Sequence, residues 1–192
     1  MATFQDKSSG LQFVFSDNWT DVIQFDEHPD VKKYAKGLSC IDFVGMFSTE
    51  KLVLIEAKNF KNRPPEQHRS IFERLGSSGG SPLAEEVAGN MKDFVVFVSH
   101  VCQKADVSAY ETWNKFHKYL LQKEIVSVLW MESDNTQYTG VGGKRIFAAK
   151  GIVSDFLQKK LAWLAGARNV FVANEVNQLT NPFGDNLKVS FL

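Results

Sequence analysis

The sequence predicts a single-domain α/β fold in which helices pack on a β-sheet. Segments with helical periodicity alternate with short apolar runs rich in β-branched residues, which is the pattern of a sheet layered with helices. The chain has 192 residues, of which 44% are hydrophobic, and this fits one domain with a large buried core. Because we find no linker that divides the chain, we assign residues 1–192 to one domain.

The elements before the long helices centre on a β-hairpin. Leu11–Phe15 predicts a short strand, and Val31–Ala35 predicts a helix that Gly37 ends. Ile41–Phe47 and Leu52–Ile55 are apolar runs on either side of the polar residues 48–51, which predicts two antiparallel strands and their turn.

The elements after the hairpin are mostly helical. Ser81 as N-cap, with Pro82 at the first position, begins the clearest helix, whose polar side carries Asn90. The remaining predicted elements are a helix over 109–122, a buried strand over 125–131, a helix over 152–165, a strand over 170–172 and an edge strand over 187–191.

Three ionisable residues interrupt the apolar hairpin. Glu56 and Lys58 share a face, because side chains alternate along a strand. If the hairpin folds about Thr49, residue 42 lies opposite residue 56, and Asp42 joins the other two. Two adjacent carboxylates stay ionised only with a cation between them, and oxygen ligands favour Mg²⁺ or Mn²⁺. With a lysine beside the ion to hold a water, this grouping is suited to cutting a phosphodiester.

The arrangement of Asp42, Glu56 and Lys58 on adjacent strands resembles the PD-(D/E)xK nuclease superfamily. The resemblance implies a restriction-endonuclease-like fold, a mixed β-sheet flanked by helices on both faces. It implies that Asp42, Glu56 and the carbonyl of Ala57 bind Mg²⁺ (or Mn²⁺), and that Lys58 positions or activates the attacking water. The substrate would be nucleic acid, with DNA favoured over RNA, and the activity that of an endonuclease. Ile41 stands where the family name implies proline.

An extra metal-site acid often lies on a helix before the hairpin in this superfamily. Glu27 and Asp30 are the candidates for that position. The alternative for each is an ordinary charge at a helix start, since Pro29 and acids near an N-terminus are typical there.

The net charge of zero, from 22 basic and 22 acidic residues, argues against a protein that coats nucleic acid. Basic residues nevertheless gather after the hairpin and again between residues 144 and 160. Phosphate contacts from such patches supply affinity without reading sequence; the alternative is a solvated surface. The predicted nucleic-acid-binding residues are Lys61, Arg63, Arg69, Lys144 and Arg145.

The expected setting is intracellular and cytoplasmic, with no membrane association. No apolar run reaches membrane-spanning length, the first residues do not resemble a secretory signal, and the two cysteines form neither a metal motif nor a disulfide framework. The sequence leaves two kinds of assembly open, a homodimer and a subunit of a larger complex. Two alternatives to a nuclease remain: a non-catalytic nucleic-acid- or protein-binding subunit with the same fold, and an α/β protein whose hairpin charges are structural.

Overall fold

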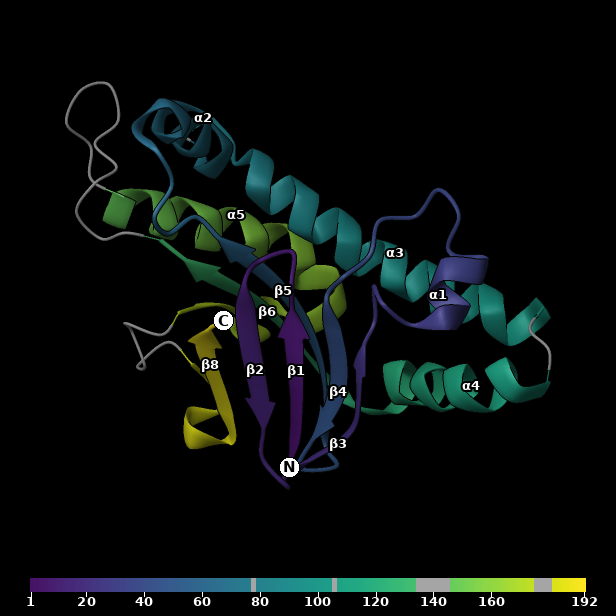
Figure 1. Ribbon diagram of the computed structural model, residues 1–192. Helices are drawn as coiled ribbons and strands as arrows, with labels where there is room; N and C mark the ends of the chain where they lie inside the picture. The colour runs from purple at the N-terminus through teal and green to yellow at the C-terminus, as the bar shows by residue number, and fades with distance from the viewer. Residues whose placement is uncertain (77–78, 105–106, 134–145, 175–180) are drawn as a thin grey trace.

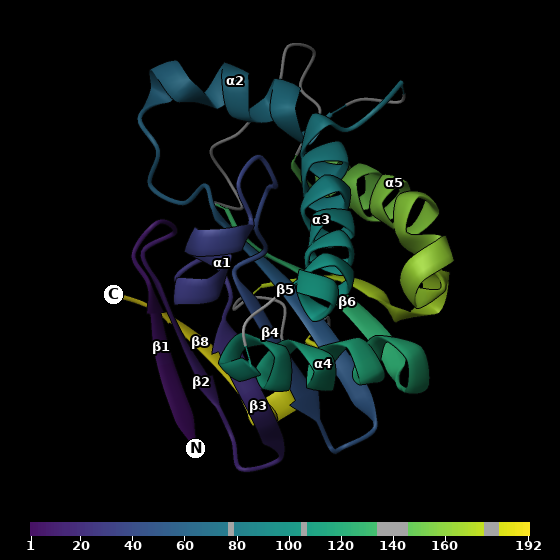
Figure 2. The same cartoon turned by 90° about the vertical axis from the view of Figure 1, so that its right-hand side faces the viewer.

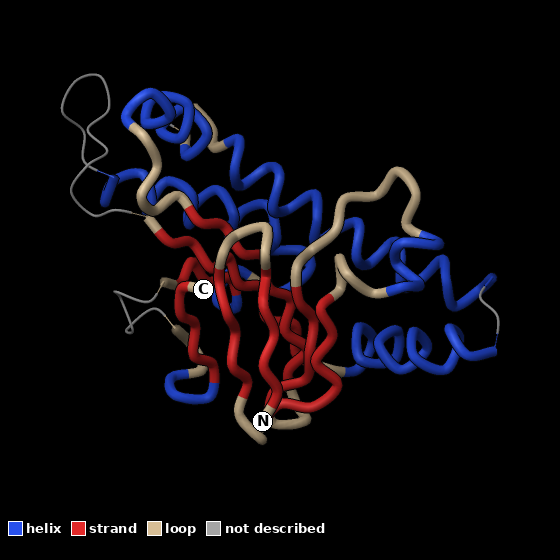
Figure 3. The backbone as a smooth tube through the Cα atoms, in the orientation of Figure 1, coloured by secondary structure: helices blue, strands red, loops and turns tan. Residues whose placement is uncertain are grey.

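Two β-sheets and five helices make up the described part of the computed structural model, which comprises residues 1–76, 79–104, 107–133, 146–174 and 181–192. The strands form a contiguous block, with helices grouped along one side of it (Figure 3). Within these residues, no helix combines the length and apolar character that crossing a bilayer requires.

The larger sheet has five strands in the order β3-β4-β5-β6-β7. β5 is central: it runs antiparallel to β4 and parallel to β6, so the sheet is mixed, as the family resemblance implies. The five strands are β3 (Trp19–Gln24), β4 (Phe43–Phe47), β5 (Lys51–Asn59), β6 (Glu124–Glu132) and β7 (Val170–Ala173).

All five helices contribute to the core on one face of this sheet. The helix α3 packs along it through buried residues such as Val87, Met91 and Phe94, and α5 contributes Leu157 and Leu161. Figure 2 shows α3 and α5 together on one side of the sheet. The helices are α1 (Pro29–Tyr34), α2 (Pro65–Leu75), α3 (Pro82–Lys104), α4 (Val107–Gln122) and α5 (Ile146–Ala165).

A second, three-stranded sheet covers the other face. It is antiparallel, has the order β1-β2-β8 and consists of β1 (Ala2–Asp6), β2 (Leu11–Phe15) and β8 (Leu187–Phe191). Phe13 of β2 packs against Phe43 and Trp130 of the larger sheet, and among the residues whose burial the structure describes, none of the five helices contributes to this second core. The expectation of helices on both faces is therefore wrong for this face, where aromatic side chains of two sheets interdigitate instead.

Several boundaries match the sequence reasoning and others do not. The strands over 11–15 and 187–191 are confirmed, the latter as an edge strand, and Ser81 caps α3 by accepting a hydrogen bond from Ala84 N (3.2 Å). β1, β3 and α2 were not predicted. β5 extends to Asn59, four residues beyond the apolar run that predicts it.

The turn between β1 and β2 lies at the carboxyl end of β5 (Figure 1). Asn59 Nδ2 donates to Ser9 O (2.8 Å), and the N–H of Leu192 donates to Gly10 O (3.0 Å). The smaller sheet thus brings its first turn, residues 7–10, to the place where β5 ends.

Candidate active site

The β4–β5 hairpin has the register that the sequence predicts. Phe43 pairs with Ile55 and Phe47 with Lys51, so the hairpin folds about Thr49. Thr49 and its neighbour Ser48 adopt positive φ angles of 59° and 52°, which close the turn tightly.

Asp42, Glu56 and Lys58 meet at the carboxyl end of the central strand. Asp42 is 8% exposed and Glu56 is 1% exposed, although both are carboxyl groups. An Asp42 oxygen accepts a hydrogen bond from the backbone N–H of Ala57 (2.6 Å). The Lys58 ammonium lies 2.7 Å from Glu56 Oε1. The structure therefore brings together the three residues that the motif singled out, on the face that also carries α3.

Two residues of α3 support this group. Asn90 Nδ2 donates to Glu56 Oε1 (3.1 Å), and Glu86 Oε1 lies 3.1 Å from Lys58 Nζ. The other Glu86 oxygen pairs with Arg74 of α2, so Lys58 is held between two carboxylates. The sequence placed Asn90 on the polar side of α3 without a partner. Nothing in the sequence indicated that Glu86 belongs to the site, because an acid in the first turns of a helix is common.

Burial and mutual repulsion make the two carboxyl groups hard to ionise. Burial, then the charge of Glu56, raises the pKa of Asp42 to about 8. Burial also raises the pKa of Glu56, against the lowering effects of Lys58 and Asn90. Burial lowers the pKa of Lys58, but Glu56 and Glu86 outweigh it, so this pKa is raised and the ammonium stays protonated. A second cation near Asp42 and Glu56 would relieve the remaining repulsion.

The oxygen atoms at this point suit such a cation. Glu56 Oε2 is buried and makes no hydrogen bond with any residue that the structure describes. The last residue pair between β4 and β5 is Phe43 with Ile55, so no β4 residue pairs with Ala57. The N–H and the carbonyl of a strand residue point to the same side. Because the Ala57 N–H donates to Asp42, the Ala57 carbonyl also lies on the Asp42 side. Among the described residues, no three His, Cys, Asp or Glu side chains form a metal-binding group. Two carboxylates, Asp42 and Glu56, and the Ala57 carbonyl are the oxygen atoms that the hairpin itself offers to a cation. Mg²⁺ can bind with so few protein ligands because it retains several water molecules in its coordination shell.

The sequence reasoning missed two further acids, Asp6, whose charge acts on Asp42, and Asp26, whose neighbour Phe25 donates its backbone N–H to Asp42 O (2.7 Å). Asp6 at the end of β1 is 1% exposed, and its charge raises the pKa of Asp42 and of Asp26. Ser8 donates to Asp6 Oδ1 from both its backbone N–H (2.9 Å) and its hydroxyl (2.7 Å). Asp6 Oδ2 and Asp26 Oδ1 are buried and have no partner among the described residues. Together with Glu27 they line an acidic cavity of about 260 Å³.

The two acids predicted as extra ligands have other partners. Glu27 pairs with Lys32 and is 60% exposed. Asp30 lies in the first turn of α1 and accepts a hydrogen bond from Trp113 Nε1 (2.9 Å), which ties α1 to α4. A role for either at the metal stays a prediction. Among the acids that line the cavity, Asp6 is the one whose charge raises the pKa of Asp42, whereas Glu27 acts on Asp26.

The predicted nucleic-acid-binding residues separate in space. Arg63 donates from Nη2 to Asn59 O (2.8 Å) and lies beside Lys58 in a small polar pocket. The Lys61 ammonium lies 4.1 Å from the centre of the Phe191 ring. Arg69 is on the exposed side of α2, where it pairs with Glu73 (2.9 Å). The two other predicted residues, Lys144 and Arg145, lie outside the described residues.

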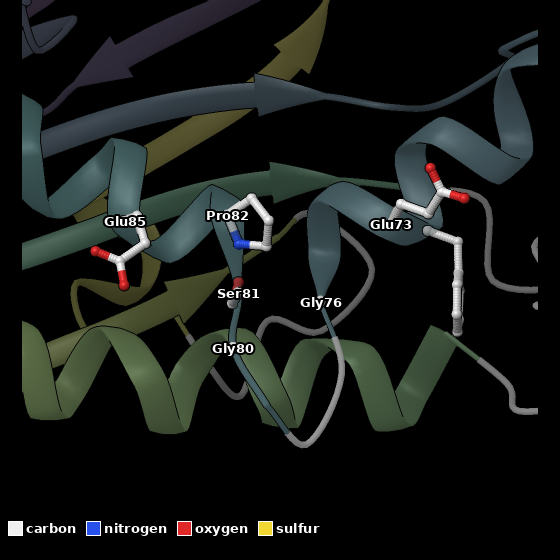
Figure 4. A pocket seen from close by; sticks show the side chains of 7 residues that line it. Glu73, Gly76, Gly80, Ser81, Pro82 and Glu85 are labelled. Atoms are coloured by element: carbon white, nitrogen blue, oxygen red, sulfur yellow. The ribbon is translucent and has the colours of Figure 1, made fainter.

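A larger cavity, of about 660 Å³, lies where the chain passes from α2 to α3 (Figure 4). Its labelled ionisable residues, Glu73 and Glu85, are both acidic. Each has a basic partner outside the cavity lining, Arg69 for Glu73 and Lys160 for Glu85. Acidic walls repel phosphates, so the basic pocket beside Lys58 is the better match to a nucleic acid.

No protein-family model matches this sequence, and no curated protein or solved structure is significantly similar to it. The functional argument therefore rests on the geometry of the site.

Proposed function

We propose that this protein is a metal-dependent phosphodiesterase that cleaves nucleic acid, acting as a DNA endonuclease. The observation that carries the proposal is the convergence of Asp42, Glu56 and Lys58 at the end of the central strand, two of them almost fully buried. Burial of two carboxylates and an ammonium costs several kcal/mol unless the charges are compensated. A fold without a chemical use for them would be more stable with apolar residues at these positions.

The residues that would hold Mg²⁺ or Mn²⁺ are Asp42, Glu56 and the carbonyl of Ala57. The unpartnered Glu56 Oε2 and the raised pKa of Asp42 both support a cation here. A bound ion supplies Lewis-acid stabilisation of the phosphoryl oxygen and of the attacking water. Asp6 and Asp26 are candidates for a third acid in addition to those predicted from the sequence.

The chain's own residues would position the water and the phosphate. Lys58 is held as an ammonium by Glu56 and Glu86, so it donates hydrogen bonds and does not take a proton directly. We assign it to orient the attacking water and to stabilise negative charge on the phosphate in the transition state. Asn90 fixes Glu56 Oε1 and leaves Oε2 for the metal.

The central sheet supports assignment to the restriction-endonuclease-like fold. The site lies on an antiparallel hairpin, and its second strand, β5, pairs in parallel with β6, while helices cover the face that carries the site. The three-stranded sheet on the other face is a departure from the expected arrangement. DNA as the preferred polymer, an intracellular location and a homodimeric or larger assembly remain predictions from the sequence.

The alternative proposal is a non-catalytic binding subunit that keeps the same fold. The observation that favours it is that Lys58 is fully engaged by two carboxylates, as in a structural ion-pair network, in a protein of zero net charge. The two proposals differ in whether the buried carboxylates bind a divalent cation.

The experiment that tests the proposal is cleavage of plasmid DNA, single-stranded DNA and RNA by the purified protein with Mg²⁺, Mn²⁺ or EDTA. We expect metal-dependent cleavage that Lys58→Ala and Glu56→Gln abolish and that Lys92→Ala, a change of the same kind at an exposed position of α3, leaves intact. Binding without cleavage under every metal condition would refute the enzyme and favour the binding subunit.

A further inference from the structure

A small basic pocket lies beside Lys58, between the β1–β2 turn and the end of β5. It has a volume of about 180 Å³. Its polar lining residues are Ser8, Ser9, Lys58, Asn59, Arg63 and Arg74. From this pocket we infer that the protein holds a second phosphate group of its substrate, next to the phosphate that is cut. This inference rests on the proposed function and names a binding position that the motif does not include.

The charge of the pocket suits an anion. Lys58, Arg63 and Arg74 contribute three positive charges. Behind them lie two carboxylates, Glu86, which pairs with Lys58 and Arg74, and Glu56, which pairs with Lys58. The pocket therefore keeps a net positive charge, which favours an anion. A phosphodiester or a terminal phosphate is such an anion.

The two arginines are anchored in a way that leaves donors available. Arg63 uses Nη2 to bond Asn59 O, and Arg74 uses Nη2 to bond Glu86. A guanidinium group has five N–H donors, so both retain donors for a phosphate, which arginine binds in a bidentate manner. Each anchor also limits the freedom of a long side chain, which lowers the entropy lost on binding.

Ser9 gives an independent sign of a ligand. It is 7% exposed, and its hydroxyl makes no hydrogen bond with the described residues. A buried hydroxyl without a partner is unfavourable. The backbone of Ser9 is held by Asn59, which donates a hydrogen bond to its carbonyl (2.8 Å), so this serine stays at the pocket wall. A phosphate oxygen in the pocket would give the hydroxyl a partner.

The surroundings also limit which ligand fits and where. On the other side of the β1–β2 turn lies the acidic cavity, whose ionisable lining is three acids, Asp6, Asp26 and Glu27, against one base, Lys7, so its net negative charge repels phosphate. The β1–β2 turn therefore separates an acidic cavity that suits cations from a basic pocket that suits anions. Lys58 lies in the basic pocket. A nucleic-acid strand that crosses the site would place one phosphate near Asp42 and Glu56 and its neighbour in the basic pocket.

The test is binding of a short fluorescent single-stranded DNA, with either a 5′-phosphate or a 5′-hydroxyl, measured by fluorescence anisotropy in EDTA. Inorganic phosphate serves as a competitor. We expect Arg63→Ala to weaken binding about tenfold, because a charge-assisted hydrogen bond is lost, and Ser9→Ala to weaken it severalfold. Arg168→Ala removes an exposed arginine after α5 that lies outside the pocket, and should stay within twofold of the wild type. Thermal melts confirm that each variant is folded.

The two DNA ends distinguish the sources of the phosphate. If Arg63→Ala weakens only the 5′-phosphorylated strand, the pocket holds a terminal phosphate; if it weakens both strands equally, the pocket holds an internal phosphodiester. The inference is overturned if Arg63→Ala and Ser9→Ala bind like Arg168→Ala, or if neither DNA nor inorganic phosphate binds. Because EDTA prevents metal-dependent cleavage, a protein that passes this test and still cuts nothing would refute the proposed enzyme alone.

Discussion

Replacing Asp42 by asparagine should stabilise the metal-free protein at neutral pH. The pKa of Asp42 is raised from 3.8 to about 8, first by burial and then by Glu56. At pH 7 the unfolded chain ionises this group, whereas the folded protein keeps the proton. The folded state is therefore penalised by about 1.4 kcal/mol for each pH unit between 3.8 and 7, which is about 4 kcal/mol. Asparagine has no such penalty, and its oxygen still accepts the hydrogen bond from Ala57.

The net gain is smaller than this limit. An unpaired amide group of asparagine would be buried, at a cost of about 1–3 kcal/mol. We therefore expect Asp42→Asn to raise the free energy of unfolding by about 1–3 kcal/mol at pH 7, or the melting temperature by about 2–10 °C. The measurement is urea and thermal denaturation in EDTA between pH 4 and pH 8, with Asp155→Asn, at an exposed position of α5, as the control that should change little.

The pH dependence gives the sign of the effect. Because the folded-state pKa of Asp42 is raised, the wild type should lose stability as the pH rises from about 4 to about 8, and the slope should be shallower in Asp42→Asn. Mg²⁺ should restore stability to the wild type at pH 8 and have little effect on the variant. A wild type that becomes more stable over this range in EDTA, or a variant that is less stable at pH 7, would refute the reasoning.

Three further changes test the site and the core. Glu86→Gln removes one of two carboxylates that raise the pKa of Lys58; we expect about tenfold slower cleavage, and a basic limb of the pH–rate profile displaced to lower pH, in steady-state assays. Gly45→Ala places a Cβ 3.0 Å from Val22 Cγ2 and 3.3 Å from its Cα, so we expect a loss of about 1–3 kcal/mol by urea denaturation; an unchanged midpoint would contradict this crowding. Trp113→Ala empties a fully buried position of α4, which should cost about 3–5 kcal/mol in the same experiment, and a loss below 1 kcal/mol would show that the core collapses around it.

The hairpin could be predicted because its information is local. Alternation at period 2 and a turn about Thr49 are enough to place residue 42 opposite residue 56, and the structure has that register. The strand β3 is different: it has a register irregularity between Thr20 and Ile23, and Asp21 there has a φ of 53°. A strand with such a bulge does not alternate regularly, which explains why the sequence pattern did not reveal it.

The second sheet could not be predicted because its pairing is not local. β2 pairs with β8, so Leu11 lies opposite Phe191 across almost the whole chain. The sequence of each strand predicts only a half-buried segment and does not indicate which other strand it pairs with. The same limit applies to Asp6 and Glu86. Both reach the site from distant elements, the first through the β1–β2 turn and the second from α3, and each looks like an ordinary surface charge in the sequence.

The site and the sheet constrain one another through β5. Its odd-numbered residues, such as Ile55, face the aromatic core between the two sheets, whereas even-numbered residues face the helices. A slip of one residue would turn Glu56 and Lys58 toward Phe43 and Trp130, where no polar group of α3 could reach them. Register is therefore fixed by the cost of misplacing two charges as well as by the apolar pattern. Burial raises the pKa of Glu56, so this carboxylate weakens the metal-free fold, and the same residue helps to exclude its nearest alternative pairing.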